Sequence, residues 1–127
     1  MVGFVIVSHS AKLAEGVADL ARMMAKSAPI APAGGLEDGG FGTSFDKISA
    51  AVEQVYSDDG VILLMDMGSA VMTAEMVMEA MEDKKLRLAD CPVAEGAVTG
   101  TIDAEAGMTL EEILEDLEQV GALKKLS

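Results

Sequence analysis

The sequence predicts an α/β fold, a single three-layer α/β/α sandwich around a mainly parallel four-stranded sheet, with residues 1–127 forming one domain. Short apolar runs alternate with segments in which apolar residues recur at helical spacing. The clearest run, residues 61–65, is apolar at every position, which is typical of a parallel strand buried on both faces. A chain of 127 residues suits one hydrophobic core. Right-handed crossovers between such strands place helices on both faces of the sheet.

The first strand is predicted at residues 4–7, and a helix is predicted from Ala11 onward. Residues 29–32 begin and end with proline, so this segment is either an edge strand or an extended connection. A glycine-rich stretch, residues 34–44, follows it. The apolar residues that recur at helical spacing in the first helix are Leu13, Val17, Leu20, Ala21 and Met24.

The next helix places Phe45, Ile48, Val52 and Val55 on one face, and either Thr43 or Ser44 could cap it. Residues 57–60 form a turn before the central strand 61–65. A helix from Ser69 through Met81 is apolar over more than one stripe. It therefore either lies deep in the fold or packs against another subunit.

Residues 85–88 predict a last short strand, and Pro92 to Ala104 predict a helix because proline is favourable near a helix start. The sequence from Thr109 to Glu112 is a capping box that begins the final helix. Lys124 and Lys125 suit the C-terminal end of that helix electrostatically. The predicted order is therefore β-α-β-α-β-α-β-α-α.

The net charge of −13 excludes nucleic acid and anionic lipid as partners. It favours a basic protein partner, although solubility alone is an equally good explanation. No apolar run is long enough to span a membrane, and no signal peptide is evident. Cys91 is the single cysteine, so no internal disulfide can form and a cytoplasmic location is expected.

The only histidine, His9, lies in the sequence Ser8-His9-Ser10 at the predicted carboxyl end of the first strand. Ligands of open α/β sheets bind in the crevice outside the carboxyl ends of the strands. The imidazole is also the side chain that titrates nearest neutral pH. Taken alone, His9 is interpreted equally well as a solvated turn residue.

Asp66 directly follows the central strand. The first and third strands would be neighbours in a short doubly wound sheet, and Asp66 could then come within hydrogen-bond distance of His9. A carboxylate there fixes the tautomer of the ring and leaves the other ring nitrogen unprotonated. The alternative is that Asp66 only caps the helix that follows.

Backbone amides and hydroxyl groups that could bind a phosphate are predicted around this pair. Helix N-termini and glycine-rich turns present free N–H groups, and serine and threonine add hydroxyl donors. The alternative for the glycine-rich stretch is a flexible connection. The candidate phosphate-binding residues are Ser10, Gly42, Thr43, Ser44, Gly68 and Ser69.

Several sharper motifs are absent from the sequence. No lysine follows the glycines as in a P-loop, no Gly-x-Gly-x-x-Gly follows the first strand, and no Gly-x-Ser-x-Gly is present. One cysteine and one histidine cannot form a structural zinc site, so no metal and no bound cofactor are expected. An imidazole held by a carboxylate beside amide donors suits a phosphoryl group carried on a ring nitrogen.

The chain resembles the mannose-type IIA family of the phosphoenolpyruvate-dependent phosphotransferase system, and within it the branch that serves dihydroxyacetone kinases. The resemblance covers essentially the whole chain. The segments that carry it are Val2 to Ser10, Gly42-Thr43-Ser44, Leu63 to Ala70 and Pro92 to Ala97.

The resemblance implies that the phosphocarrier protein HPr phosphorylates His9 and that Asp66 orients its ring. It also implies transfer to ADP on the nucleotide-binding subunit of the kinase, whose third subunit binds dihydroxyacetone. A homodimer is implied as well. Some relatives continue into fused domains, so a chain that ends at Ser127 is either a single-domain version or a truncated one.

Two alternatives remain at the level of sequence. One is the IIA component of a mannose-type sugar transporter, which would hand its phosphate to a IIB domain. The other is a non-catalytic anion-binding regulatory module with the same architecture. The phosphorylated ring nitrogen, the strand order, the dimer geometry and the roles of Lys12 and Arg22 are left open.

Overall fold

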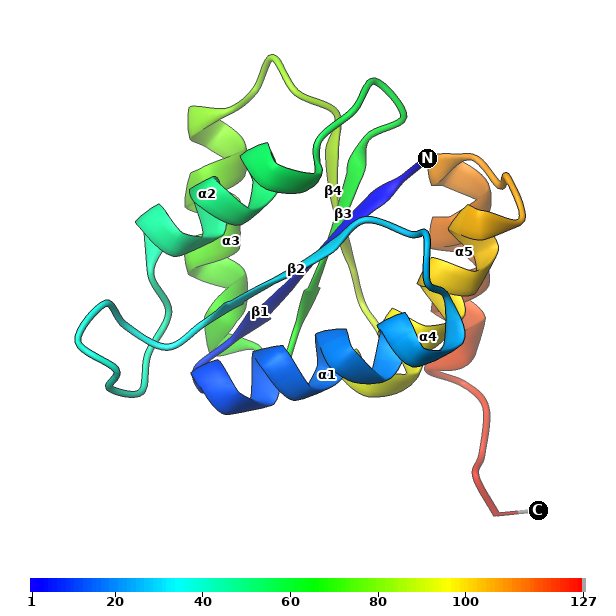
Figure 1. Ribbon diagram of the computed structural model, residues 1–127, viewed down its shortest axis with the longest axis horizontal. Helices are drawn as coiled ribbons and strands as arrows, with labels where there is room; N and C mark the ends of the chain where they lie inside the picture. Colours follow the sequence, from blue (N-terminus) through cyan, green and yellow to red (C-terminus); the bar gives the residue numbers. More distant parts are fainter. Residues whose placement is uncertain (127) are drawn as a thin grey trace.

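The computed structural model describes residues 1–126, and the order of its elements confirms the predicted alternation (Figure 1). The strands are β1 (Gly3–Ser8), β2 (Ile30–Gly34), β3 (Val61–Met65) and β4 (Leu86–Ala89). The helices are α1 (Ala11–Met24), α2 (Phe45–Val55), α3 (Ser69–Ala80), α4 (Val93–Glu105) and α5 (Leu110–Val120).

The four strands form one parallel sheet in the order β2-β1-β3-β4. Val7 of β1 aligns with Ala33 of β2 on one side and with Met65 of β3 on the other. The prediction that the first and third strands are neighbours is therefore confirmed, and β2, which contains Pro32, is an edge strand. This register brings the residues that follow β1 and β3 to the same edge of the sheet.

Helices cover both faces of the sheet, which confirms the three-layer architecture (Figure 1). Because side chains alternate along a strand, Phe4 and Ile6 pack under α1, α4 and α5, whereas Val5 and Val7 pack under α2 and α3. The sheet thus separates two apolar cores, and its strands are apolar on both faces.

The buried face of α1 agrees with the predicted one at Val17 and Ala21 and differs from it at the other positions. The buried residues are Ala14, Val17, Ala18 and Ala21, whereas Leu13, Leu20 and Met24 are 42% to 55% exposed. The reason is the close approach of α1 to β2. A Cβ atom added at Gly34 would lie 2.8 Å from the Cβ of Ala14, so only small side chains fit between the two elements.

Helix α3 buries a single stripe formed by Ala70, Ala74 and Val77. Met72 and Met76 are 72% and 56% exposed, so the helix does not lie deep in the fold of one chain. Packing of this helix against another subunit stays a prediction.

The predicted capping box at α5 is confirmed. The side chain of Thr109 accepts a hydrogen bond from the backbone N–H of Glu112, and the Glu112 carboxylate accepts one from the backbone N–H of Thr109 at 2.9 Å. These reciprocal bonds satisfy donors that a helix start otherwise leaves unpaired.

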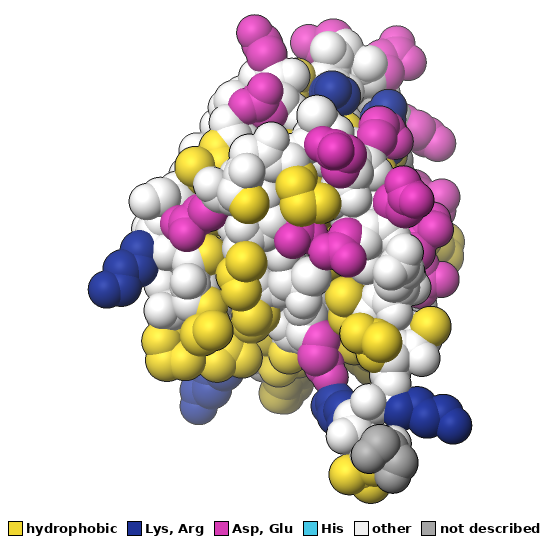
Figure 2. Space-filling model, turned by 90° about the vertical axis from the view of Figure 1, so that its right-hand side faces the viewer, with side chains coloured by type: hydrophobic (Ala, Val, Ile, Leu, Met, Phe, Trp, Pro, Cys, Tyr) yellow, Lys and Arg dark blue, Asp and Glu magenta, His cyan; other side chains and the backbone are white. Residues whose placement is uncertain are grey.

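Acidic side chains gather on the face of the molecule formed by α4 and α5 (Figure 2). The exposed acidic residues of α5 are Glu111, Glu112, Glu115 and Glu118. Within residues 1–126, no helix is both long enough and apolar enough to cross a membrane.

Candidate functional site

His9 lies in the two-residue turn between β1 and α1, at the carboxyl edge of the sheet, as predicted. Ser10 is the N-cap of α1, with an extended backbone (φ −120°, ψ 125°), and its hydroxyl accepts a hydrogen bond from the N–H of Leu13 at 3.2 Å. The His9 carbonyl accepts a hydrogen bond from the N–H of Gly42 at 2.9 Å. The turn is therefore held both by its helix cap and by the glycine-rich loop.

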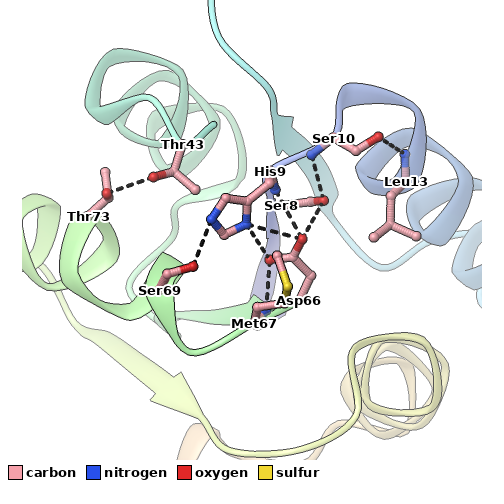
Figure 3. A network of polar contacts seen from close by, with 9 residues as sticks. All are labelled: Ser8, His9, Ser10, Leu13, Thr43, Asp66, Met67, Ser69 and Thr73. Carbon is pink, nitrogen blue, oxygen red and sulfur yellow. Dashed lines mark hydrogen bonds and ion pairs between the residues drawn. The ribbon is translucent and has the colours of Figure 1, made fainter. Parts of the chain in front are cut away.

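Asp66 follows β3 and lies beside this turn, as Figure 3 shows. The Nδ1 atom of His9 is 3.1 Å from Oδ1 of Asp66, so the predicted hydrogen-bond distance between the two side chains is confirmed. The same carboxylate accepts three further hydrogen bonds, from the Ser8 hydroxyl at 2.9 Å, the His9 N–H at 3.0 Å and the Met67 N–H at 2.8 Å. Four donors thus fix its orientation.

These hydrogen bonds also set the charge of Asp66. Burial alone would raise the pKa of this carboxyl group. The hydrogen bonds from the His9 N–H, the Ser8 hydroxyl and the His9 ring, together with the attraction of the ring, outweigh burial and hold the pKa below its usual value. A carboxylate only accepts hydrogen bonds, so the Nδ1 atom of His9 carries the proton.

The other ring nitrogen, Nε2, then has a free lone pair. The hydroxyl of Ser69 lies 2.9 Å from Nε2 and donates to it in this tautomer (Figure 3). The His9 side chain is 24% exposed, whereas that of Asp66 is 8% exposed. The arrangement therefore offers one nucleophilic nitrogen, Nε2, to an incoming reactant and buries the group that orients it.

Ser69 is the first residue of α3, and Gly68 is the N-cap without a side-chain capping bond. The N–H groups of Ala70 and Val71 donate to the carbonyls of Met67 and Gly68 at 3.0 and 3.1 Å, and the helix dipole makes this end of α3 positive. An anion on Nε2 would thus face the start of α3. Because the cap of α3 is Gly68, the alternative in which Asp66 serves only as the helix cap is wrong.

The hydroxyls of Ser10 and Ser44 are used in helix caps. Ser44 is the N-cap of α2, where its hydroxyl accepts the N–H of Lys47 at 3.1 Å and donates to the carboxylate of Glu37. The structure therefore selects Ser44 over Thr43 as the cap of this helix. Neither serine hydroxyl is directed at the His9 ring, and phosphate binding by these residues stays a prediction.

Thr43 and Gly42 connect the glycine-rich loop to the site. The Thr43 hydroxyl lies 2.8 Å from that of Thr73 in α3, which links the loop to the helix that carries Ser69 (Figure 3). Gly42 has φ +149°, and a Cβ atom there would lie 2.9 Å from Leu36. Binding of phosphate by Thr43 and Gly42 also stays a prediction.

Ser8 is the residue of the site whose contribution the sequence did not reveal. It is fully buried, and its hydroxyl joins Asp66 to the N–H of Ser10. The signal available in the sequence was a polar residue that ends an otherwise apolar strand. Arg22, whose role was open, points away from the site, because one of its guanidinium nitrogens donates to the Ile30 carbonyl at 2.8 Å.

The described part of the chain has no group of three or more His, Cys, Asp or Glu residues placed to hold a metal ion. The burial of Cys91 and the charges of Asp90 and Glu95 raise the pKa of its thiol to about 11. The titratable side chains that contact each other at this edge of the sheet are those of His9 and Asp66.

Comparison with known proteins identifies the family of the chain. The model of the EIIA-man family, described as "PTS system fructose IIA component", matches residues 3–117. The chain therefore belongs to the EIIA-man family of phosphotransferase-system components.

Within that family, the chain is similar to proteins named DhaM. It is 43% identical to the phosphotransferase subunit DhaM of the PTS-dependent dihydroxyacetone kinase of Lactococcus lactis, over 93% of this chain and 94% of that protein. It is 40% identical to the phosphoryl donor subunit DhaM of Escherichia coli, over 91% of this chain but only 26% of that protein. The chain thus spans nearly all of the first relative and about a quarter of the second.

Solved structures share the fold. A crystal structure of a protein of unknown function, EF1359, aligns with a TM-score of 0.86 at 27% identity and covers 99% of this chain and 98% of its own. A sigma-54 interaction domain protein from Enterococcus faecalis aligns with a TM-score of 0.73 at 17% identity, over 93% of this chain and 88% of its own. The second likeness concerns the fold alone.

Proposed function

We propose that this chain is a phosphohistidine carrier and acts as the phosphoryl donor subunit of a phosphoenolpyruvate-dependent dihydroxyacetone kinase. The observation that carries the proposal is the state of the His9 ring. Its Nδ1–H is held by an anionic carboxylate, and its Nε2 lone pair lies at a partly exposed edge beside the start of α3. The similarity to proteins named as DhaM phosphoryl donor subunits supports the choice of kinase.

In the proposed first step, the Nε2 lone pair of His9 attacks the phosphorus of a phosphoryl group carried on a histidine of HPr. The new P–N bond forms as the P–N bond to the carrier breaks, and the bonding pair leaves with the carrier imidazole. His9 keeps its Nδ1 proton throughout. The ring becomes an imidazolium, whose positive charge the Asp66 carboxylate stabilises at 3.1 Å.

The Ser69 hydroxyl changes partner during this step. It donates to Nε2 before the reaction, and it must release that lone pair when the phosphorus arrives. The same hydroxyl and the positive end of the α3 dipole then lie on the side where the phosphoryl oxygens come to rest. Phosphoryl transfer depends mainly on such positioning and electrostatic stabilisation.

In the proposed second step, a β-phosphate oxygen of ADP attacks the same phosphorus and the P–N bond breaks. Its electrons return to Nε2 as a lone pair, which regenerates the starting tautomer of His9. We propose that ADP is bound by the nucleotide-binding subunit of the kinase and that this chain holds no cofactor of its own. A homodimer and a cytoplasmic location are retained as proposals.

Mass spectrometry at neutral to alkaline pH tests the proposal. The protein is incubated with phosphoenolpyruvate, enzyme I and HPr, and is then challenged with the ADP-loaded and dihydroxyacetone-binding subunits of the kinase. We expect one phosphoryl group on His9 that is discharged by the kinase subunits, and no phosphorylation of a His9→Ala variant. Absence of phosphorylation of the folded wild-type protein by active donors would refute the carrier function.

A second candidate has support from the description of the family model as a fructose IIA component. In that case His9 carries the phosphoryl group in the same way, but the acceptor is a IIB domain of a sugar transporter. The challenge step separates the two candidates. A phosphoryl group that stays on His9 with the kinase subunits and leaves with a IIB domain would establish the transporter function.

A further inference from the structure

Ser8 links the Asp66 carboxylate to the turn that carries His9, although it contacts neither the Nε2 atom of His9 nor the solvent. It is the last residue of β1 and its exposed fraction is 0%. We infer that Ser8 is a positioning residue for phosphoryl transfer, which holds the Asp66 carboxylate in the orientation that fixes the His9 tautomer. The expected effect of Ser8 on the rate of phosphoryl transfer rests on the proposed function, whereas its expected effect on the tautomer of the His9 ring does not.

The direction of the Ser8 hydrogen bonds is determined by their partners. The backbone N–H of Ser10 lies 3.0 Å from Oγ of Ser8 and can only donate, so it occupies a lone pair of that oxygen. The single hydroxyl proton is then directed to Oδ2 of Asp66 at 2.9 Å. A hydroxyl that accepts one hydrogen bond is polarised into a stronger donor for the next.

This hydroxyl bears on the rotation of the carboxylate. The torsion that turns an aspartate carboxylate is broad, so neighbouring donors must select its angle. Without the Ser8 hydroxyl, Oδ2 keeps the His9 N–H at 3.0 Å and a longer 3.4 Å contact with Nδ1, and Oδ1 keeps the Met67 N–H at 2.8 Å. The 3.1 Å bond from Nδ1 to Oδ1 is then less well fixed, and with it the ring orientation that directs Nε2 toward Ser69.

Burial makes the hydroxyl hard to replace. Ser8 is fully buried and the Asp66 side chain is 8% exposed, so bulk water has little access to the position the hydroxyl leaves. Its removal also strands the N–H of Ser10, which has Oγ of Ser8 as its acceptor. Loss of the Ser8 hydroxyl would therefore weaken the hydrogen bonding of the turn that carries His9 as well as that of the Asp66 carboxylate.

Three variants separate this role from a general loss of stability. Ser8→Ala removes the hydroxyl, and Ser8→Thr retains it. Thr101→Val is the matched control, since Thr101 is also fully buried and its hydroxyl donates to the Ala97 carbonyl at 2.7 Å within α4, away from Asp66. Two properties are measured for each variant, the single-turnover rate of phosphorylation by phospho-HPr and the tautomer of the His9 ring from its ¹⁵N chemical shifts.

We expect Ser8→Ala to slow phosphorylation about tenfold and to mix the two ring tautomers, because a hydrogen bond to a charged group is lost. Ser8→Thr and Thr101→Val are expected to keep the Nδ1–H tautomer and to stay within about threefold of the wild-type rate. Equal losses in Ser8→Ala and Ser8→Thr, or in Ser8→Ala and Thr101→Val, would overturn the inference. So would a Ser8→Ala variant with wild-type rate and tautomer.

Failure of the proposed function is recognised separately. If the wild-type protein is not phosphorylated at all, the carrier function is refuted, and the ¹⁵N measurement alone decides whether Ser8 orients the pair. A single Nδ1–H tautomer in Ser8→Ala would then overturn the inference, and a mixture would support it.

Discussion

Replacement of Asp66 by asparagine, which has nearly the same shape, tests whether the carboxylate fixes the tautomer of the His9 ring and stabilises its positive charge. The carboxylate receives four donors, namely the Ser8 hydroxyl, the backbone N–H groups of His9 and Met67, and the Nδ1–H of the His9 ring. An amide has one oxygen and one NH₂ group, and the NH₂ group only donates. Each of its two orientations therefore brings the NH₂ group against at least two of these donors.

The two orientations have different consequences. If the amide oxygen stays near Ser8, the NH₂ group faces Nδ1 of His9, and the ring proton must move to Nε2, which removes the nucleophilic lone pair. If the oxygen faces Nδ1, the tautomer is kept, but the NH₂ group opposes the Ser8 hydroxyl and the His9 N–H. Both orientations also remove the negative charge that stabilises the imidazolium.

The size of the effect follows from the hydrogen bond that is lost. A hydrogen bond to a charged group contributes roughly 1.5–3 kcal/mol, and each 1.36 kcal/mol changes a rate tenfold. Asp66 is 8% exposed, so solvent screens this interaction little. We expect Asp66→Asn to slow phosphorylation by roughly 10- to 150-fold, with a further loss where the ring adopts the wrong tautomer.

Rapid-quench single-turnover kinetics with phospho-HPr measures this effect. The matched control is Glu115→Gln, an exposed carboxylate of α5 whose replacement makes the same change to the net charge of −13. We expect the control to stay within about twofold of wild type, since exposed charges distant from the site contribute little. A rate for Asp66→Asn within threefold of wild type, with the ring still in the Nδ1–H tautomer, would refute the reasoning.

Three further changes test other parts of the structure. Burial, together with the hydrogen bond and charge of Asp116, raises the pKa of Asp103 from 3.8 to about 7, so the folded chain retains a proton that the unfolded chain releases. The free energy of unfolding should therefore fall as the pH rises from about 3.8 to about 7. Urea unfolding should show a smaller difference in this free energy between pH 5 and pH 8 for Asp103→Asn than for wild type, and an equal difference would contradict this. Gly34→Ala places a Cβ 2.3 Å from the Ser10 carbonyl oxygen, and we expect a loss of about 1–3 kcal/mol or more in thermal unfolding, whereas a wild-type Tm would show that the turn gives way easily. Thr109→Ala breaks the capping box and should cost about 1 kcal/mol in urea unfolding, with Thr109→Ser near wild type and phosphorylation unchanged.

Much of the fold could be predicted because its signals are local. The apolar run of β3 and the capping box at Thr109 depend on residues within a few positions of one another, and both predictions are confirmed. The buried face of α1 was predicted only in part, with Val17 and Ala21 buried as predicted, because its remaining contacts are not local. Periodicity marks Leu13 and Leu20 as apolar, but the distance from α1 to β2 decides that Ala14 and Ala18 are buried in their place.

The candidate site also has features that the sequence predicted and features that it did not. A histidine after one strand and an aspartate after another could be recognised in the sequence, but their meeting also required the first and third strands to be neighbours, which the strand order of the structure shows. The choice of Ser44 over Thr43 as the cap of α2 was not predictable, because both residues suit the position and the difference lies in contacts with Glu37 and Thr73.

The sequence by itself determined the class of fold, the order of the elements and the identity of the His9–Asp66 pair, because apolar periodicity, helix caps and residue chemistry are properties of short segments. The tertiary structure decided which ring nitrogen is free and which groups hold the carboxylate. Ser8 and Asp66 are 58 positions apart, and their hydrogen bond exists because β1 and β3 pair in one register and end at the same edge. Hydrogen bonds of 3 Å depend on that register, which short segments of sequence do not specify.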